Sequence, residues 1–218
     1  MREGGERLIF DGRILGASFA SGDRIVAGRW HASPFGPFAD VMWCRPDGTR
    51  VLLAPSETVA AFVARHYSFD EIERTDVSVE RRNGAIEVTG GSLDLRIVPG
   101  SPGFASRLLW LRPRRMRTSA MWIAFEDSVV RPIAGPLFGP NARSIRTRGV
   151  TRDGSREWYA IHDFLEGDAS ASVNGADLGP VTPGPPAGFG FSEFPGGAAI
   201  VRVTSIFQPA DGRAPGGG

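Results

Sequence analysis

The stretch "RRNGAIEVTGGSLDL" (residues 81–95) decides the fold class, because it places two tight turns between short runs of strand-forming residues. Asn83-Gly84 is the preferred pair for a type I′ turn, since both positions tolerate a positive φ, and this turn matches the twist of paired strands. Gly90-Gly91 marks a second turn a few residues later. The stretch therefore predicts three consecutive antiparallel strands.

The same turn chemistry recurs along the chain, where Asn174-Gly175, Asp47-Gly48 and Asp153-Gly154 each separate two β-rich runs. We expect strands at residues 7–19, 24–32, 38–45, 49–54, 70–82, 85–89, 92–98, 143–151, 156–164, 168–173, 187–194 and 198–207. About twelve short strands must close or stack, because long exposed edges promote aggregation. The predicted fold is mainly β: an antiparallel β-barrel or a strongly bent β-sandwich.

One clear helix is predicted in "APSETVAAFVARHY" (residues 54–67), where Ser56 suits the N-cap and Val59, Phe62, Val63 and His66 recur at helical spacing. We expect residues 1–207 to form a single barrel-like domain that contains a basic, partly helical insertion at residues 99–142. Residues 208–218 are expected to be a disordered tail, because they have almost nothing to bury.

Charge is unevenly distributed, although the formal net charge is only +1. Residues 95–152 hold eleven arginines and two acids, whereas both flanks are net acidic, so nucleic-acid binding is not expected. The chain has no lysine, which excludes Schiff-base catalysis, pyridoxal phosphate attachment and the lysine of nucleotide-binding loops. Cys44 is the only cysteine, which excludes an internal disulfide and a thiolate zinc site. We predict neither a metal nor a cofactor.

The sequence has no stretch near 18 consecutive apolar residues, and its first residues lack the apolar run of a signal peptide. We therefore expect a soluble cytoplasmic protein without a transmembrane segment. A homo-oligomer is compatible with the sequence.

Two strands carry candidate site residues. In "REWYAIHDF" (residues 156–164), alternation puts Trp158 and His162 on one face. In "GFGFSEFPGG" (residues 188–197), it puts Phe191 and Glu193 on one face. If these faces line one cavity, His162 and Glu193 form a catalytic acid–base pair and Trp158 and Phe191 contact the ligand. The alternatives are a core histidine with a satisfied hydrogen bond and a glutamate exposed beside a turn.

The basic stretch "RLLWLRPRRMR" (residues 107–117) supplies the remaining candidates. If it lies across the barrel mouth, Arg114, Arg115 and Arg117 can bind a carboxylate or phosphate, because the planar guanidinium binds such groups bidentately. The alternatives are plain solvated surface, contact with nucleic acid and a short membrane-surface helix.

Three functions stay open at this stage. The first is binding of a small, largely apolar ligand in a β-barrel cavity, with any acidic group held by arginine. The second is an enzyme that uses His162 and Glu193 in the same cavity. The third is a structural or interaction protein whose arginine-rich segment contacts an acidic partner, a second copy of the chain included.

Overall fold

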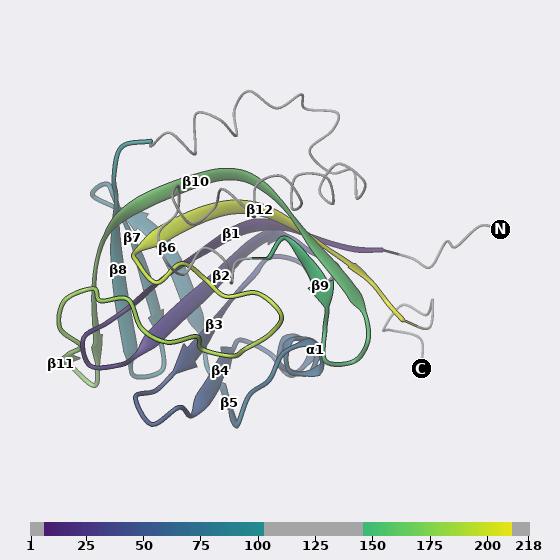
Figure 1. Ribbon diagram of the computed structural model, residues 1–218, viewed down its shortest axis with the longest axis horizontal. Helices are drawn as coiled ribbons and strands as arrows, with labels where there is room; N and C mark the ends of the chain where they lie inside the picture. The colour runs from purple at the N-terminus through teal and green to yellow at the C-terminus, as the bar shows by residue number, and fades with distance from the viewer. Residues whose placement is uncertain (1–6, 103–145, 211–218) are drawn as a thin grey trace.

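The computed structural model describes residues 7–102 and 146–210 (Figure 1). In the first range, the elements are β1 (Leu8–Ser18), β2 (Arg24–Ala32), β3 (Phe38–Cys44), β4 (Arg50–Ala54), α1 (Glu57–His66), β5 (Glu71–Arg74), β6 (Val77–Arg82), β7 (Ala85–Gly90) and β8 (Leu93–Pro99). In the second, they are β9 (Arg148–Val150), β10 (Arg156–Val173), β11 (Ala176–Asp177) and β12 (Ala199–Gln208).

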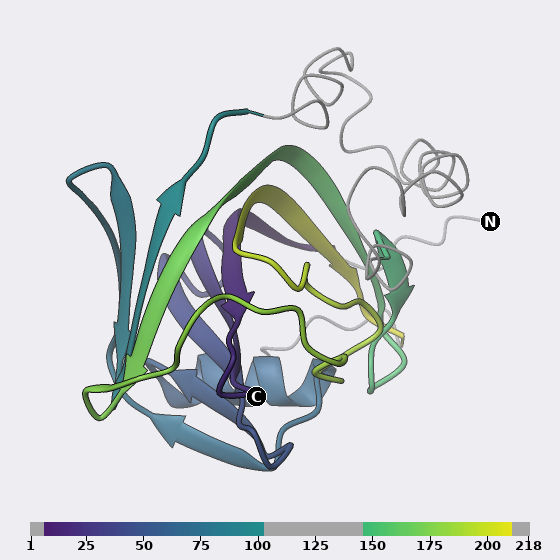
Figure 2. The ribbon, with the colours of Figure 1, turned by 60° about the vertical axis from the view of Figure 1, so that its left-hand side comes forward.

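The strands form one curled sheet in the order β5-β4-β3-β2-β1-β12-β10-β8-β7-β6, with β9 and β11 each paired to β10. The β4–β5 pair is parallel, because α1 crosses over between these two strands, and the other pairs are antiparallel. The sheet curves around its interior as a half-barrel (Figure 2). The predicted fold class, mainly β and barrel-like with one clear helix, is confirmed.

The chain itself brings the two ends of the sheet together. β5 and β6 lie at opposite ends of the strand order, yet only Thr75 and Asp76 separate them in the sequence. The sheet must therefore curl until its first and last strands approach each other. The apolar side chains of both halves then meet inside.

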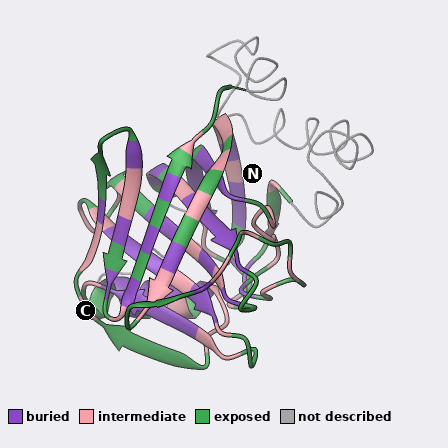
Figure 3. Cartoon of the chain, turned by 90° about the vertical axis from the view of Figure 1, so that its left-hand side faces the viewer, coloured by how far each residue is buried: buried purple, intermediate pink, exposed green. Residues whose placement is uncertain are grey.

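The interior is filled by a core to which both halves of the sheet contribute. Its aliphatic members include Leu15, Ile25, Val41, Val51, Leu53, Val88, Leu93, Leu95, Ile97 and Ile200, and all are buried. This packing places buried side chains at the centre of the half-barrel. On some strands, β8 among them, buried residues alternate with exposed ones (Figure 3).

A second, aromatic core forms where α1 packs on the sheet. β4 is buried on both faces, because Val51 and Leu53 join the inner core while Leu52 and Ala54 join the core beneath α1. The rings of Phe10 and Phe62 stack at the centre of this second core, 5.0 Å apart. The helix begins as predicted, with the Ser56 hydroxyl accepting a hydrogen bond from Val59 N at 3.3 Å.

The predicted hairpin turns are confirmed. Asn83 and Gly84 have φ values of 50° and 80°, and Asn174 and Gly175 have values of 51° and 78°. These are the positive φ values that a type I′ turn requires at both central positions.

Three strand predictions were wrong. Residues 70–82 form two strands at opposite ends of the sheet. The segments 156–164 and 168–173 are one continuous strand, because Gly167 stays in register opposite Pro99 and its N–H donates to Ala198 O at 3.0 Å. Residues 187–194 form an irregular loop instead of a strand.

Several predictions concern residues outside the described ranges. The described ranges include only the first four residues of the basic insertion expected at 99–142. They include only the first three residues of the tail expected at 208–218. Of the strand expected at 143–151, the described part contains β9. In the described ranges, no helix is both long and apolar enough to span a bilayer.

Candidate functional site

One carboxyl group of the described chain is buried between the sheet and the end of α1. Glu157, the second residue of β10, is only 1% exposed. Its side chain is surrounded by hydroxyl groups from three different elements. Tyr67 Oη lies 2.7 Å from both carboxyl oxygens, and Ser205 Oγ donates to Oε1 at 2.8 Å.

A third hydroxyl extends this network outward. Tyr159 Oη lies 3.0 Å from Tyr67 Oη. When Tyr67 donates its single proton to the Glu157 carboxylate, it can only accept from Tyr159, so the chain of donors runs from Tyr159 through Tyr67 to Glu157. Both tyrosines are partly exposed as residues, whereas Glu157 is buried. The network therefore joins a buried carboxyl group to two tyrosines whose hydroxyl groups are themselves desolvated.

Burial dominates the electrostatics of this carboxyl group. Desolvation raises the pKa of Glu157 from 4.5 to about 7, although the hydrogen bonds from Tyr67 and Ser205 lower it. Desolvation, followed by the nearby Glu157 carboxylate, also raises the pKa of both tyrosines well above 10. At neutral pH the site therefore contains neutral tyrosines and a carboxyl group that can hold or release a proton.

Strand register explains why these residues meet. Glu157 pairs with Phe207 and Tyr159 pairs with Ser205, so the side chains of these four residues lie on the same side of the sheet as the aromatic core. Tyr67 reaches the same place as the C-cap of α1, where its N–H donates to Val63 O at 3.0 Å.

The loop between Thr182 and Ala198 covers the outer side of the tyrosines. Phe191 stacks on Tyr159 with 5.7 Å between ring centroids and an angle of 22°. Gly190 lies so close to Tyr67 that a Cβ atom at position 190 would be only 2.7 Å from the Tyr67 ring. The loop is tied to the end of α1 by the bond from Ser68 N to Phe189 O, at 2.8 Å.

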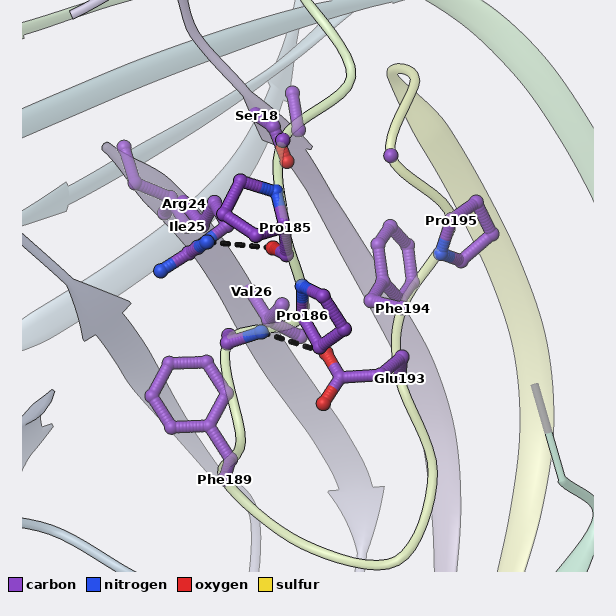
Figure 4. A pocket seen from close by; sticks show the side chains of 14 residues that line it. Ser18, Arg24, Ile25, Val26, Pro185, Pro186, Phe189, Glu193, Phe194 and Pro195 are labelled. Carbon is purple, nitrogen blue, oxygen red and sulfur yellow. Dashed lines mark hydrogen bonds between the residues drawn. The ribbon is translucent and has the colours of Figure 1, made fainter. Parts of the chain in front are cut away.

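Glu193, predicted as a catalytic residue, holds this loop together. Its two carboxyl oxygens accept hydrogen bonds from Ala187 N and Gly188 N, each at 2.9 Å. Glu193 also lines a small pocket between the loop and the Arg24 end of β2, where Arg24 donates to Pro185 O (Figure 4). The pocket has a volume of about 30 Å³, which is room for about one water molecule.

His162, its predicted partner, lies at a bulge in β10 between Ile161 and Asp163. Its Nε2 atom is 2.8 Å from Thr204 Oγ1. Because Thr204 pairs with Ala160, this contact is on the Trp158 side of the sheet, opposite Glu157. The structure thus gives His162 and Glu193 different partners, and the acid–base pair stays a prediction.

The predicted ligand-binding residues are separated in the same way. Phe191 lies beside Tyr159 and so belongs to the Glu157 site. Trp158 is buried on the other face of β10, with the guanidinium of Arg7 5.3 Å from its ring. The predicted anion ligands Arg114, Arg115 and Arg117 lie outside the described residues.

The sequence interpretation missed Glu157, Tyr67, Tyr159 and Ser205 as a site. Alternation along residues 156–164 puts Glu157 and Tyr159 on the face opposite Trp158 and His162, and this is a usable signal, since a carboxylate on a buried face needs hydrogen-bond donors. Their partners could not be identified in this way, because Tyr67 is 90 residues from Glu157 and Ser205 is 48 residues from it.

A second carboxyl group is buried on β3. Desolvation raises the pKa of Asp40 to about 7, and its one recorded donor, Trp30 Nε1, lies 3.0 Å from Oδ1. Gly28 leaves room for this contact, because a Cβ atom there would be 2.5 Å from Oδ1. Among the described residues, no three His, Cys, Asp or Glu side chains are grouped so as to hold a metal ion.

Comparison with known proteins gives distant structural similarities only. The acetoacetate decarboxylase from Legionella pneumophila aligns with a TM-score of 0.43 and 9% identity, over 93% of this chain and 84% of that one. A second acetoacetate decarboxylase structure gives a TM-score of 0.46 and 8% identity over the same shares. A protein assigned as AttH from Nitrosomonas europaea gives 0.31 and 11%, over 93% of this chain and 52% of that one.

No family model matches the sequence, and no curated protein matches it. At these identities and TM-scores, the structural similarities do not assign a function to this chain.

Proposed function

We propose that the protein binds a small, largely apolar ligand whose polar group is hydrogen-bonded by Glu157 and its two tyrosines. The observation that carries this proposal is a buried carboxyl group linked through Tyr67 to the partly exposed Tyr159. Buried polar groups that converge beside aromatic side chains are typical of ligand sites, where few polar groups orient a mostly apolar molecule.

The chemistry of the site restricts the polar group of the ligand. With its pKa near 7, Glu157 can donate a hydrogen bond when protonated and accept one when ionised. A carbonyl, hydroxyl or amide suits both states. A ligand carboxylate suits only the protonated state, because two buried negative charges repel each other, so an acidic ligand binds better below pH 7.

The apolar part of such a ligand lies against the loop rather than inside the half-barrel. Among the described residues, the inner core consists of buried side chains from both halves of the sheet. Phe191 and Phe189 of the loop already contact Tyr159 and Phe69, respectively. The ligand therefore occupies the place of the loop over the tyrosines, and binding requires this loop to shift outward.

A second candidate function is an enzyme in which Glu157 transfers a proton. The observation that favours it is the pKa of about 7, because a general acid or base works best when its pKa lies near the working pH. For such an enzyme, Glu157→Gln abolishes turnover while ligand binding survives, because the amide keeps the shape but cannot exchange a proton.

Native mass spectrometry of the purified full chain tests the proposed site, together with thermal unfolding in the presence of small ketones, alcohols and acids. We expect a retained molecule or a rise in Tm for the unmodified protein, and a weaker effect in Phe191→Ala and Tyr159→Phe. Ile72→Ala is the matched control, since Ile72 is 52% exposed on β5. If no compound raises the Tm and no molecule is retained, the proposal is wrong.

A further inference from the structure

Three arginines lie side by side across three neighbouring strands. Arg13 of β1 pairs directly with Arg202 of β12 on one side and with Arg29 of β2 on the other. Directly paired residues of antiparallel strands point to the same side of the sheet, so the three side chains form one row. We call this row the arginine ladder.

The ladder lies on the side of the sheet opposite Glu157. Counting along β1, Arg13 shares its side with Leu15, two residues on, and Leu15 belongs to the inner core. All three arginines are exposed, whereas Leu15 and its paired residues Ile200 and Ala27 are buried. The ladder thus begins where the inner core ends.

Like charges in direct cross-strand register are unfavourable unless opposite charges compensate them, and another such pair, Glu80 opposite Glu87, has arginines beside it. On β7 and β8, Glu87 pairs with Arg96 and their charged atoms lie 3.9 Å apart. On β6, Arg82 binds Glu80 at 2.7 Å. In contrast, no ion pair recorded among the described residues involves Arg13, Arg29 or Arg202.

The acids nearest to the ladder each make a contact elsewhere through one carboxyl oxygen, and Oδ1 of Asp11 has no hydrogen-bond partner among the described residues. Asp163 pairs with Arg202, but its Oδ1 atom accepts a hydrogen bond from Phe164 N at 3.0 Å. Asp11, two residues before Arg13, lies 3.6 Å from His31. Glu80 interacts electrostatically with Arg29, but its carboxylate is bound by Arg82. None of these acids forms an ion pair with the ladder.

We propose that the arginine ladder is a binding site for a small ligand with two adjacent phosphate groups. Neighbouring residues of paired strands have Cα atoms about 5 Å apart, so three guanidinium groups span about 10 Å. One oxyanion binds the planar donors of two guanidinium groups, and the third is then available to a second oxyanion. The bound charge removes the repulsion within the row.

This site is independent of the proposed function, because it uses none of the residues of the Glu157 site. Its test is isothermal titration calorimetry of the full chain with inorganic pyrophosphate at low salt. We expect binding that weakens at least tenfold in Arg13→Gln and in Arg29→Gln, since each change removes charge-assisted hydrogen bonds. Arg82→Gln is the charge-matched control, because its guanidinium is already bound by Glu80, and it changes Kd less than twofold.

The same protein samples are mixed with vesicles that contain phosphatidylglycerol, which carries isolated phosphates on a surface. The proposal predicts that pyrophosphate competes with any vesicle binding that depends on the ladder. It is overturned if the unmodified protein does not bind pyrophosphate, if Arg82→Gln weakens binding as much as Arg13→Gln, or if the ladder binds vesicles alone. Glu157→Gln should bind pyrophosphate normally, which separates a failure here from a failure of the Glu157 site.

Discussion

Ser205 and Arg202 lie on the same strand, β12, but on opposite sides of the sheet. The ionisable groups on these two sides have different partners. Ser205 faces a carboxyl group that is buried and surrounded by hydroxyl groups of the protein. Arg202 belongs to an exposed row of like charges without an ion-pair partner among the described residues. On the Ser205 side, hydroxyl groups of the protein bind the Glu157 carboxyl group. On the Arg202 side, we propose that an external ligand binds the arginine ladder.

The largest expected difference between the two sides concerns packing. Phe10 lies under α1, where its ring contacts Phe62, Phe207, Phe35, Phe38 and Trp30. Phe10→Ala should lower the free energy of unfolding by about 3–5 kcal/mol, because it opens a cavity in a packed core. Ile9 is the control on the opposite side and is 53% exposed.

Urea unfolding of both variants measures this difference, and Ile9→Ala should change stability by no more than about 0.5 kcal/mol. Equal losses in the two variants would mean that the two sides are not packed differently.

The second prediction concerns the pH dependence of stability. A folded-state pKa of about 7 against 4.5 unfolded means that the folded protein holds the Glu157 proton more tightly. Glu157 therefore favours the folded state most below pH 4.5, and about 3 kcal/mol of this preference is lost as the pH rises to 7.

Chemical denaturation between pH 4 and pH 8 tests this sign. In Glu157→Gln, the loss of folding stability between pH 4 and pH 8 should be smaller by about 3 kcal/mol. The part of this loss that is due to Asp40 remains, because the pKa of Asp40 is also raised to about 7. An unchanged pH profile in the variant would show that Glu157 ionises normally.

Much of the fold could be predicted from local sequence. Asn83-Gly84 and Asn174-Gly175 fix their hairpins through backbone conformation, and Ser56 fixes the start of α1 through one hydrogen bond. These signals act within a few residues. The loop at 187–194 was misread as a strand because its alternating aromatics imitate one, whereas Glu193 binds the backbone N–H groups of the loop itself.

The sites could not be predicted, because they depend on pairing between distant segments. The ladder exists only because β1 pairs with β12, which places Arg13 beside Arg202. No local property of either arginine indicates that register. In the same way, Tyr67 reaches Glu157 only when α1 packs on the sheet. Alternation in the sequence can indicate that a carboxylate lies on a buried strand face, but the residues that donate hydrogen bonds to it depend on tertiary structure.

A third prediction concerns the donors of Glu157. Tyr67→Phe removes the hydroxyl group that contacts both carboxyl oxygens. The free energy of unfolding should fall by about 2 kcal/mol at pH 8, where the carboxylate is charged, and by about 1 kcal/mol at pH 4. Denaturation of the variant at both pH values checks this, and an equal loss at the two would show that the bond does not depend on the charge.

The smallest expected effect is on the ladder side. Arg13→Gln removes repulsion from two neighbouring arginines, so at low salt the Tm should rise by about 1 °C. At about 1 M NaCl the rise should disappear, because salt screens exposed charges. Scanning calorimetry at both salt concentrations measures this shift, and a lower Tm at low salt would indicate that Arg13 has a stabilising partner within the protein.

The pKa of Glu157 decides whether the protein keeps a proton on this buried carboxyl group near neutral pH. A ¹³C NMR titration of the glutamate side-chain carboxyl carbons, with Glu157→Gln to assign the signal, measures it directly. We expect a midpoint at about pH 7 for Glu157. A midpoint at or below pH 4.5 would contradict it, because the carboxyl group would then be ionised in neutral solution like an exposed glutamate.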